Sequence, residues 1–175
     1  MNTTPRRKRN RLDGNLYAIP GAFFITVCTK GRRNLFWCGE VEEPQSKPVL
    51  SEIGQIAEDE ILTLAEGYGP FMRVEKHVIM PNHVHILLTM EAPSETSCPD
   101  IRYVMRLYKR KVSQRAGHSI WQKGFYDRIV RDEHEYREIW KYIDENPVKW
   151  NLDRYFPNDG QYLIPAGDEG IAPTS

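Results

Sequence analysis

The segment HVHILLTM, residues 83–90, is apolar except for two histidines and a threonine, and it directly follows Pro81-Asn82. A short apolar run bounded by turn residues is typical of a buried strand. The residues before the turn, FMRVEKHVIM, alternate imperfectly between apolar and polar side chains and predict a second strand. The two segments together predict a β-hairpin against which the rest of the chain must pack.

Periodic segments on either side of this hairpin predict the remaining elements. Ser51 and Asp132 are suitable N-caps for two helices, and a β-branched and aromatic run predicts the first strand. In chain order we expect a strand at 22–29, a helix at 51–66, strands at 71–80 and 83–90, a helix at 101–112, a strand at 125–132 and a helix from 133 onward. The order βαββαβ plus a terminal helix predicts an α+β, ferredoxin-like fold, in which an antiparallel sheet is covered by helices on one face.

The composition predicts a single domain with polar ends. With 175 residues, of which 40% are hydrophobic, the chain can bury one core. We expect a basic N-terminal arm at 1–21, a domain at 22–150 and a C-terminal tail at 151–175. We expect a cytoplasmic protein, because no apolar run is long enough to cross a bilayer and no apolar segment follows the basic start. The three widely spaced cysteines, without a CxxC pair, argue against a disulfide framework or a zinc ribbon.

The chain has no net charge, but its cations are concentrated in two blocks. One block lies near the N-terminus, and the other lies on the polar face of the helix predicted at 101–112. The blocks consist of Arg6, Arg7, Lys8 and Arg9 and of Arg102, Arg106, Lys109, Arg110 and Lys111. Such blocks favour a local site for a polyanion such as a nucleic acid. A solvated helix face beside a basic arm would explain the same charges without a partner.

His83 and His85 are two residues apart on a predicted strand, so their side chains point to the same face of the sheet. Their Cβ atoms would be roughly 6 to 7 Å apart, close enough for both rings to bind one metal ion. Two ligands do not complete a site, so further donors must come from another element, from water or from a substrate. Two hydrogen-bonded histidines on a solvated sheet face are the alternative. His77 is equally well explained as a core histidine.

The last predicted helix carries a tyrosine beside its apolar stripe, which consists of Tyr136, Ile139, Trp140 and Ile143. Tyr142 lies about 100° around the helix from Ile143, and Asn146 lies one turn further on the same edge. A phenol is a potential nucleophile and a carboxamide oxygen is a donor for Mg²⁺ or Mn²⁺, so the pair could act on an anion. Equally, Tyr142 could be a boundary aromatic and Asn146 could simply end the helix before a proline.

The segments PNHVHILL, WQKGFYDRIVRD and YIDENPVKW, together with the basic helix, resemble the REP-associated tyrosine transposases. These are domesticated relatives of the single-tyrosine HUH transposases of small bacterial insertion sequences. The resemblance spans residues 22–150. It implies the HUH transposase fold, a ferredoxin-like sheet with a C-terminal helix that carries the tyrosine.

The resemblance also implies roles for single residues. His83 and His85 would bind Mg²⁺ or Mn²⁺, Asn146 would join them at the ion, and Tyr142 would attack the DNA backbone. The substrate would be single-stranded DNA with hairpin-forming repeats, and the product would be a 5′-phosphotyrosine linkage. The protein would then act at the nucleoid, and a homodimer is one expected assembly because insertion-sequence relatives exchange the tyrosine helix across a dimer.

Two other functions fit the same residues. The first is a non-catalytic module that binds single-stranded nucleic acid, since RRM domains share the ferredoxin-like plan, although the chain lacks a convincing aromatic RNP1 cluster. The second is a metal-dependent hydrolase in which His83 and His85 activate water and Tyr142 is structural.

Overall fold

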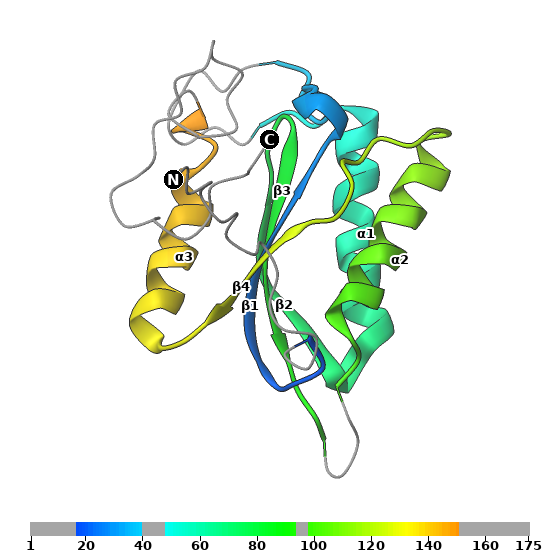
Figure 1. The fold of residues 1–175 in the computed structure, drawn as a ribbon. Helices are drawn as coiled ribbons and strands as arrows, with labels where there is room; N and C mark the ends of the chain where they lie inside the picture. Colours follow the sequence, from blue (N-terminus) through cyan, green and yellow to red (C-terminus); the bar gives the residue numbers. More distant parts are fainter. Residues whose placement is uncertain (1–16, 40–47, 94–97, 151–175) are drawn as a thin grey trace, which may run out of the picture.

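The computed structural model describes residues 17–39, 48–93 and 98–150 (Figure 1). Its strands and helices are β1 Gly21–Cys28, α1 Glu52–Tyr68, β2 Met72–Ile79, β3 His83–Met90, α2 Ile101–Arg115, β4 Tyr126–Val130 and α3 Glu133–Glu145, with 3-10 turns η2 Lys30–Arg32 and η3 Gly69–Phe71. The predicted basic residues Arg6, Arg7, Lys8 and Arg9 and the predicted tail lie outside the described residues. Within the described ranges, no helix is long and apolar enough to cross a membrane.

The four strands form one antiparallel sheet in the order β2-β3-β1-β4. Strand β3 lies between β1 and β2, which α1 connects, and β1 lies between β3 and β4, which α2 connects. This interleaved arrangement of two split βαβ units is the ferredoxin-like plan. The α+β fold and the hairpin of β2 and β3 expected from the sequence are therefore confirmed.

The two faces of the sheet are covered by different helices. Alternate residues of β1, namely Phe23, Ile25 and Val27, pack with α1 and α2 in the main core. Phe24, on the other face, packs with Leu87 and with two residues of α3, Ile139 and Ile143. Figure 1 shows α1 and α2 together on one side of the sheet and α3 on the opposite side. The expected layer of helices on one face thus consists of α1 and α2, and the terminal helix covers the other face.

Several local details differ from the expectations. Helix α1 continues past its expected end at residue 66 and stops at Tyr68, because the backbone reverses only at Gly69, whose φ is +38°. Tyr17, which we placed in the arm, is 2% exposed and belongs to the main core. Trp140, which we placed in the apolar stripe of α3, is 37% exposed. The Lys76 ammonium lies 4.2 Å from the centre of the Trp140 ring, so this ring lies at the edge of the layer.

Glycine at position 54 is required where α1 begins. The Ser51 hydroxyl caps this helix by accepting a hydrogen bond from the Gly54 N–H, at 3.1 Å. The same turn lies against the Phe36 carbonyl, which accepts a hydrogen bond from the Ser51 N–H at 2.8 Å. A Cβ atom on residue 54 would lie 2.2 Å from the Phe36 oxygen. The backbone of residue 36 therefore excludes any side chain there.

We expect Gly54→Ala to lower the free energy of unfolding by about 1–3 kcal/mol, although alanine is the better helix former, because the new methyl group overlaps backbone atoms. The matched control is Gly67→Ala, in the last turn of the same helix, where an added Cβ meets nothing within 4 Å. That substitution should raise the free energy of unfolding by roughly 0.5–1 kcal/mol. Urea denaturation of both variants measures the two values, and a stabilised Gly54→Ala variant would contradict the close approach.

Candidate active site

The two histidines of β3 form a buried pair on the α3 face of the sheet. Both side chains are 0% exposed. Their ring centres are 4.5 Å apart, and the two Nε2 atoms face each other at 2.9 Å. The alternative of histidines on a solvated sheet face is therefore wrong, because helix α3 and neighbouring aromatic rings cover this face.

Each ring is held at its other nitrogen by a buried oxygen. The Thr26 hydroxyl lies 2.8 Å from His85 Nδ1, and the Asn82 carboxamide oxygen lies 2.9 Å from His83 Nδ1. Hydrogen bonds of this kind orient the imidazoles of metal sites in general. The sequence pattern pointed to neither Thr26 nor Asn82. Thr26 is opposite His85 only in the observed β1–β3 register, and Asn82 resembled an ordinary turn residue.

Tyr142 reaches the histidine pair from α3. Its hydroxyl oxygen is 3.3 Å from His85 Nε2, and the centres of the two rings are 5.3 Å apart. Phe24 stacks on the His85 ring at 5.0 Å and meets the Tyr142 ring edge-on at 6.0 Å. The phenol is half-buried, as expected for a position at the edge of the apolar stripe. The structure therefore brings a candidate nucleophile to the candidate metal ligands.

Asn146 lies one turn after Tyr142, as the C-cap of α3, and is 3% exposed. Its side-chain nitrogen is buried and has no hydrogen-bond partner among the described residues. An unsatisfied buried amide is costly, so this position favours a ligand, a water or an ion that completes its bonding. A carboxamide can also turn by 180° and present its oxygen at the same place.

The residues present fit a divalent metal ion. Two donors at adjacent positions of an octahedral ion, each roughly 2.1 Å from it, would be about 3.0 Å apart. The 2.9 Å between the Nε2 atoms agrees with that separation. No group of three or more His, Cys, Asp or Glu side chains in the described ranges could hold a metal. The remaining donors must therefore be an amide such as Asn146, water or substrate.

Trp150 closes the site on the side of His83, and sequence analysis gave it no role. Its ring centre is 5.9 Å from that of His83 and 6.3 Å from that of Trp37, and the residue is 8% exposed. The two histidines thus lie under aromatic rings from α3 and from the residues that follow it.

His77 lies on the opposite face of the sheet from the histidine pair. It is opposite Ile86 in the β2–β3 pairing, and its Nε2 atom is 3.6 Å from a carboxylate oxygen of Glu58 on α1. Burial lowers the pKa of His77 below its ordinary value, and the Glu58 carboxylate partly opposes this effect. His77 therefore does not join the candidate metal site.

The predicted basic face lies on α2, on the other side of the sheet from α3 (Figure 1), the helix that carries Tyr142. Arg102 forms an ion pair with Asp100, and its guanidinium lies over the Tyr17 ring. The Arg106 guanidinium lies 5.2 Å from the centre of the Tyr103 ring. The predicted cations of α2 therefore do not surround the histidine pair and Tyr142.

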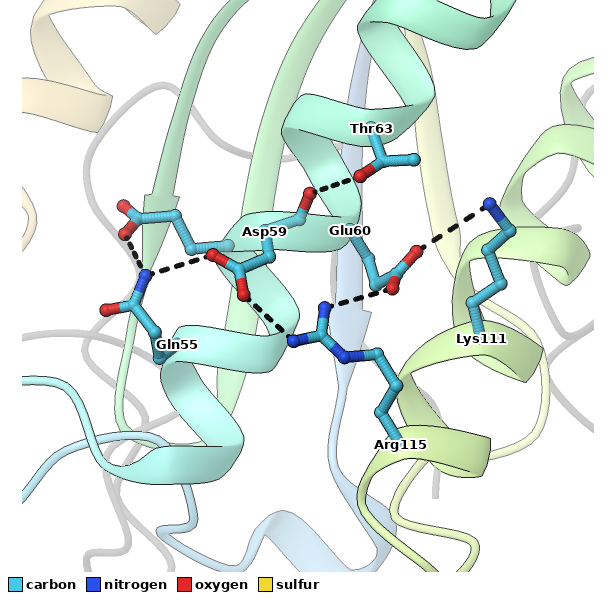
Figure 2. Close-up of polar contacts among 7 residues, drawn as sticks. Gln55, Asp59, Glu60, Thr63, Lys111 and Arg115 are labelled. Carbon is cyan, nitrogen blue, oxygen red and sulfur yellow. Dashed lines mark hydrogen bonds and ion pairs between the residues drawn. The ribbon is translucent and has the colours of Figure 1, made fainter.

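Two further predicted cations have partners within the fold. The Lys109 ammonium donates to the carbonyls of Gln122 and Gly124, both at 2.6 Å. Lys111 lies 3.8 Å from the buried Glu60 of α1, and Figure 2 shows both residues in a network that also includes Arg115. Arg110 is exposed, so among the predicted residues of α2 it is well placed to meet a phosphate. Binding of DNA by this face remains a prediction.

Comparison with solved structures identifies the fold. The REP-associated tyrosine transposase that was solved bound to a REP hairpin superposes on the chain with a TM-score of 0.58 and 22% sequence identity, covering 86% of this chain and 74% of that chain. The chain has the fold of a REP-associated tyrosine transposase. An uncharacterized protein of Haemophilus influenzae is 27% identical over 174 residues, which cover 86% of this chain and 93% of that protein. A scan against models of known protein families finds no match.

The contacts of Lys109 and Arg110 lead to opposite expectations for two adjacent cations. Lys109→Met should lower the free energy of unfolding by about 1–2 kcal/mol, because two carbonyls lose a charged donor. Arg110→Met should leave stability unchanged and weaken binding to single-stranded DNA, with the salt dependence reduced by about 0.7 in the slope of log K against log salt. Thermal denaturation and fluorescence anisotropy measure the two effects. If Lys109→Met lost as much DNA affinity as Arg110→Met and kept the stability of the wild type, the structural role of Lys109 would be contradicted.

Proposed function

We propose that this protein is a metal-dependent enzyme that cleaves single-stranded DNA and transfers the strand through a 5′-phosphotyrosine intermediate on Tyr142. The observation that carries this proposal is the 3.3 Å distance between the Tyr142 hydroxyl and Nε2 of His85, within a buried histidine pair. A nucleophile beside two nitrogens that can bind one ion is the arrangement that metal-assisted phosphoryl transfer requires.

The residues that would hold the ion are His83, His85 and Asn146. A bound divalent ion would supply positive charge that polarises a phosphate oxygen and offsets charge developing during displacement. Of the two expected ions, Mn²⁺ suits a pair of imidazole nitrogens better than Mg²⁺, which prefers carboxylate oxygens and water.

Tyr142 performs the covalent step in this proposal. Its phenolic oxygen attacks the phosphorus in line, a tyrosyl–phosphate bond forms, and the bond to the 3′ oxygen of the preceding nucleotide breaks and leaves a 3′-OH. A free phenol has a pKa of ~10, so positive charge near the histidine pair is needed to favour the phenolate. Because the phosphodiester is exchanged rather than hydrolysed, a 3′-OH can reverse the step and join strands without ATP.

Entry of the substrate requires movement of side chains. Neither histidine is accessible to solvent, so a phosphate can approach their Nε2 atoms only when the covering rings of Tyr142 and Trp150 shift. Helix α3 is connected to the neighbouring sheet edge by an ion pair of 2.7 Å between Lys76 and Asp144. The Asp144 side chain is 59% exposed, so this contact is weak enough to open when DNA binds.

The proposed partner is single-stranded DNA with hairpin-forming repeats, as for the structural neighbour solved with a REP hairpin. Because α2 lies on the other side of the sheet, Arg106 and Arg110 would contact DNA away from the cleaved phosphate. The arm residues Arg6, Arg7, Lys8 and Arg9 would add phosphate contacts. Such an enzyme would act in the cytoplasm, at the nucleoid, and as a homodimer if the tyrosine helix is exchanged.

A covalent adduct tests the identity of the nucleophile. We expect the wild-type chain to form a denaturation-resistant adduct with hairpin DNA that carries a 3′ label, in the presence of Mn²⁺, whereas a 5′ label should leave with the released strand that ends in a 3′-OH. Tyr142→Phe should abolish the adduct, because the ring still packs but lacks the attacking oxygen. Tyr136→Phe, a half-buried tyrosine on the same helix, is the matched control and should form the adduct normally.

The same assay separates the alternatives. Cleavage that persists in Tyr142→Phe would indicate hydrolysis by activated water. DNA binding without cleavage in the wild type, with Mn²⁺ present, would indicate a non-catalytic binding module.

Removal of one imidazole tests the metal site. His83→Ala should abolish Mn²⁺ binding in calorimetry and cleavage in the adduct assay, while DNA affinity stays within about 3-fold because phosphate contacts supply most of it. His118→Ala removes an exposed histidine and should leave all three measurements unchanged. Mn²⁺ affinity that is unaffected in a folded His83→Ala variant would refute the assignment.

A further inference from the structure

We propose that Asn82 and Thr26 are positioning residues of the metal site, with different tasks. Asn82 holds His83 permanently in the tautomer that presents Nε2 as an acceptor, whereas Thr26 allows His85 to change tautomer when an ion binds. This inference rests on the proposed metal site. It concerns how the chain prepares two facing imidazoles to bind one cation.

The orientation of Asn82 follows from its two side-chain contacts. Its Nδ2 donates to the Arg32 carbonyl at 3.2 Å, and a carbonyl can only accept. The carboxamide oxygen is therefore the atom that lies 2.9 Å from His83 Nδ1. Since this oxygen can also only accept, Nδ1 of His83 must carry the hydrogen. The neutral ring then presents the lone pair of Nε2 to the site.

The backbone of Asn82 is held as firmly as its side chain. Its carbonyl accepts hydrogen bonds from the Thr29 N–H, at 2.8 Å, and from the Thr29 hydroxyl, at 3.0 Å. Asn82 is 0% exposed. If the Asn82 carboxamide turned to donate to His83 Nδ1, its oxygen would face the Arg32 carbonyl and the hydrogen bond to Arg32 would be lost. The Asn82 side chain therefore favours a single tautomer of His83, with the hydrogen on Nδ1.

In the metal-free protein, we infer that the ring hydrogen of His85 lies on a different nitrogen from that of His83. A hydrogen bond of 2.9 Å between the two Nε2 atoms needs one hydrogen, and the hydrogen of neutral His83 is already on Nδ1. With both rings neutral, His85 would carry its hydrogen on Nε2, near which the Tyr142 hydroxyl oxygen also lies at 3.3 Å, and its Nδ1 would accept from the Thr26 hydroxyl at 2.8 Å. When an ion occupies both Nε2 atoms, the hydrogen of His85 must be on Nδ1.

The Thr26 hydroxyl suits both states, because a hydroxyl rotates and can donate or accept. During metal binding, when the covering rings have shifted, His85 would release a proton from Nε2 and take one up at Nδ1, so the ring would stay neutral and the proton count would be unchanged. Thr26 is 1% exposed and lies opposite His85 in the strand pairing, so it stays next to His85 in either state. A carboxamide at position 26 could not serve in the same way, since its oxygen and nitrogen would have to exchange places.

The test uses the full-length chain labelled with ¹⁵N-histidine. Imidazole ¹⁵N shifts should show the metal-free protein with hydrogen on Nδ1 of His83 and on Nε2 of His85. Addition of Zn²⁺, a diamagnetic probe ion, should move the hydrogen of His85 to Nδ1 and leave that of His83 in place. The opposite tautomers in the metal-free chain would overturn the inference whatever the metal affinity.

Mn²⁺ affinity provides the second measurement. Thr26→Val has nearly the same shape and no hydroxyl, and should weaken Mn²⁺ binding 10- to 100-fold. Thr26→Ser restores the hydroxyl and should bind within about 3-fold of the wild type. Asn82→Leu should weaken binding similarly, but it also removes the contact to Arg32, so the threonine pair is the decisive comparison if that variant does not fold.

The outcomes distinguish the two proposals. If the wild type binds Mn²⁺ and folded Thr26→Val binds it equally well, the positioning role is overturned and the proposed function is untouched. If the wild type does not bind Mn²⁺, the metal site is overturned and this inference with it.

Discussion

The antiparallel pairing of β1 with β3, at the centre of the sheet, is the interaction on which the candidate site depends. In this register Thr26 is opposite His85 and Cys28 is opposite His83. A shift of β3 by one residue would turn both histidines toward the apolar core under α1 and α2, away from Tyr142. Ile86 of the same strand is buried in the main core on the other face, so such a shift is costly, because a histidine would take its place there.

The site is built between one face of this sheet and a single helix. Helix α3 packs there through Ile139 and Ile143 against Phe24 and Leu87, and this small apolar contact also positions Tyr142. The hydrogen bonds of the histidines lie among buried residues, where such bonds are strong and an unpaired polar group is costly. The imidazoles are therefore organised before any ion or substrate arrives. Under the proposed function, the cost of this arrangement is that a DNA phosphate would have to displace aromatic rings to reach them.

Not every cation that the sequence places on the basic face of α2 is available to a binding partner. Helix α2 carries a basic face, yet Lys109 donates to backbone carbonyls and Lys111 lies beside the buried Glu60. The ion pairs of Lys111 and Arg115 with Glu60 help to hold α2 on α1 (Figure 2). Cations such as Arg110 remain at the surface, on the side of the sheet away from the histidines. Part of the basic face of α2 thus serves the fold.

The sequence by itself determined the order and approximate limits of the elements, the hairpin of β2 and β3, and the common face of His83 and His85. These features depend on periodicity and turn chemistry, which act over a few residues. It also placed Tyr142 and Asn146 on one helix edge. The prediction that Trp140 belongs to the apolar stripe of α3 was wrong. Helical periodicity does not tell how much of the helix surface the sheet can cover.

Only the tertiary structure decided which residues complete the site. Thr26 and His85 are 59 residues apart in sequence, and His85 and Tyr142 are 57 apart. Their contacts follow from strand register, from the face that α3 covers and from the burial of polar groups that must then find partners. Local sequence patterns carry no information on these three properties, because each depends on segments that meet only when the whole domain folds. The same reason explains why only the folded protein shows Asn82 and Trp150 beside the histidine pair and His77 on the opposite face of the sheet.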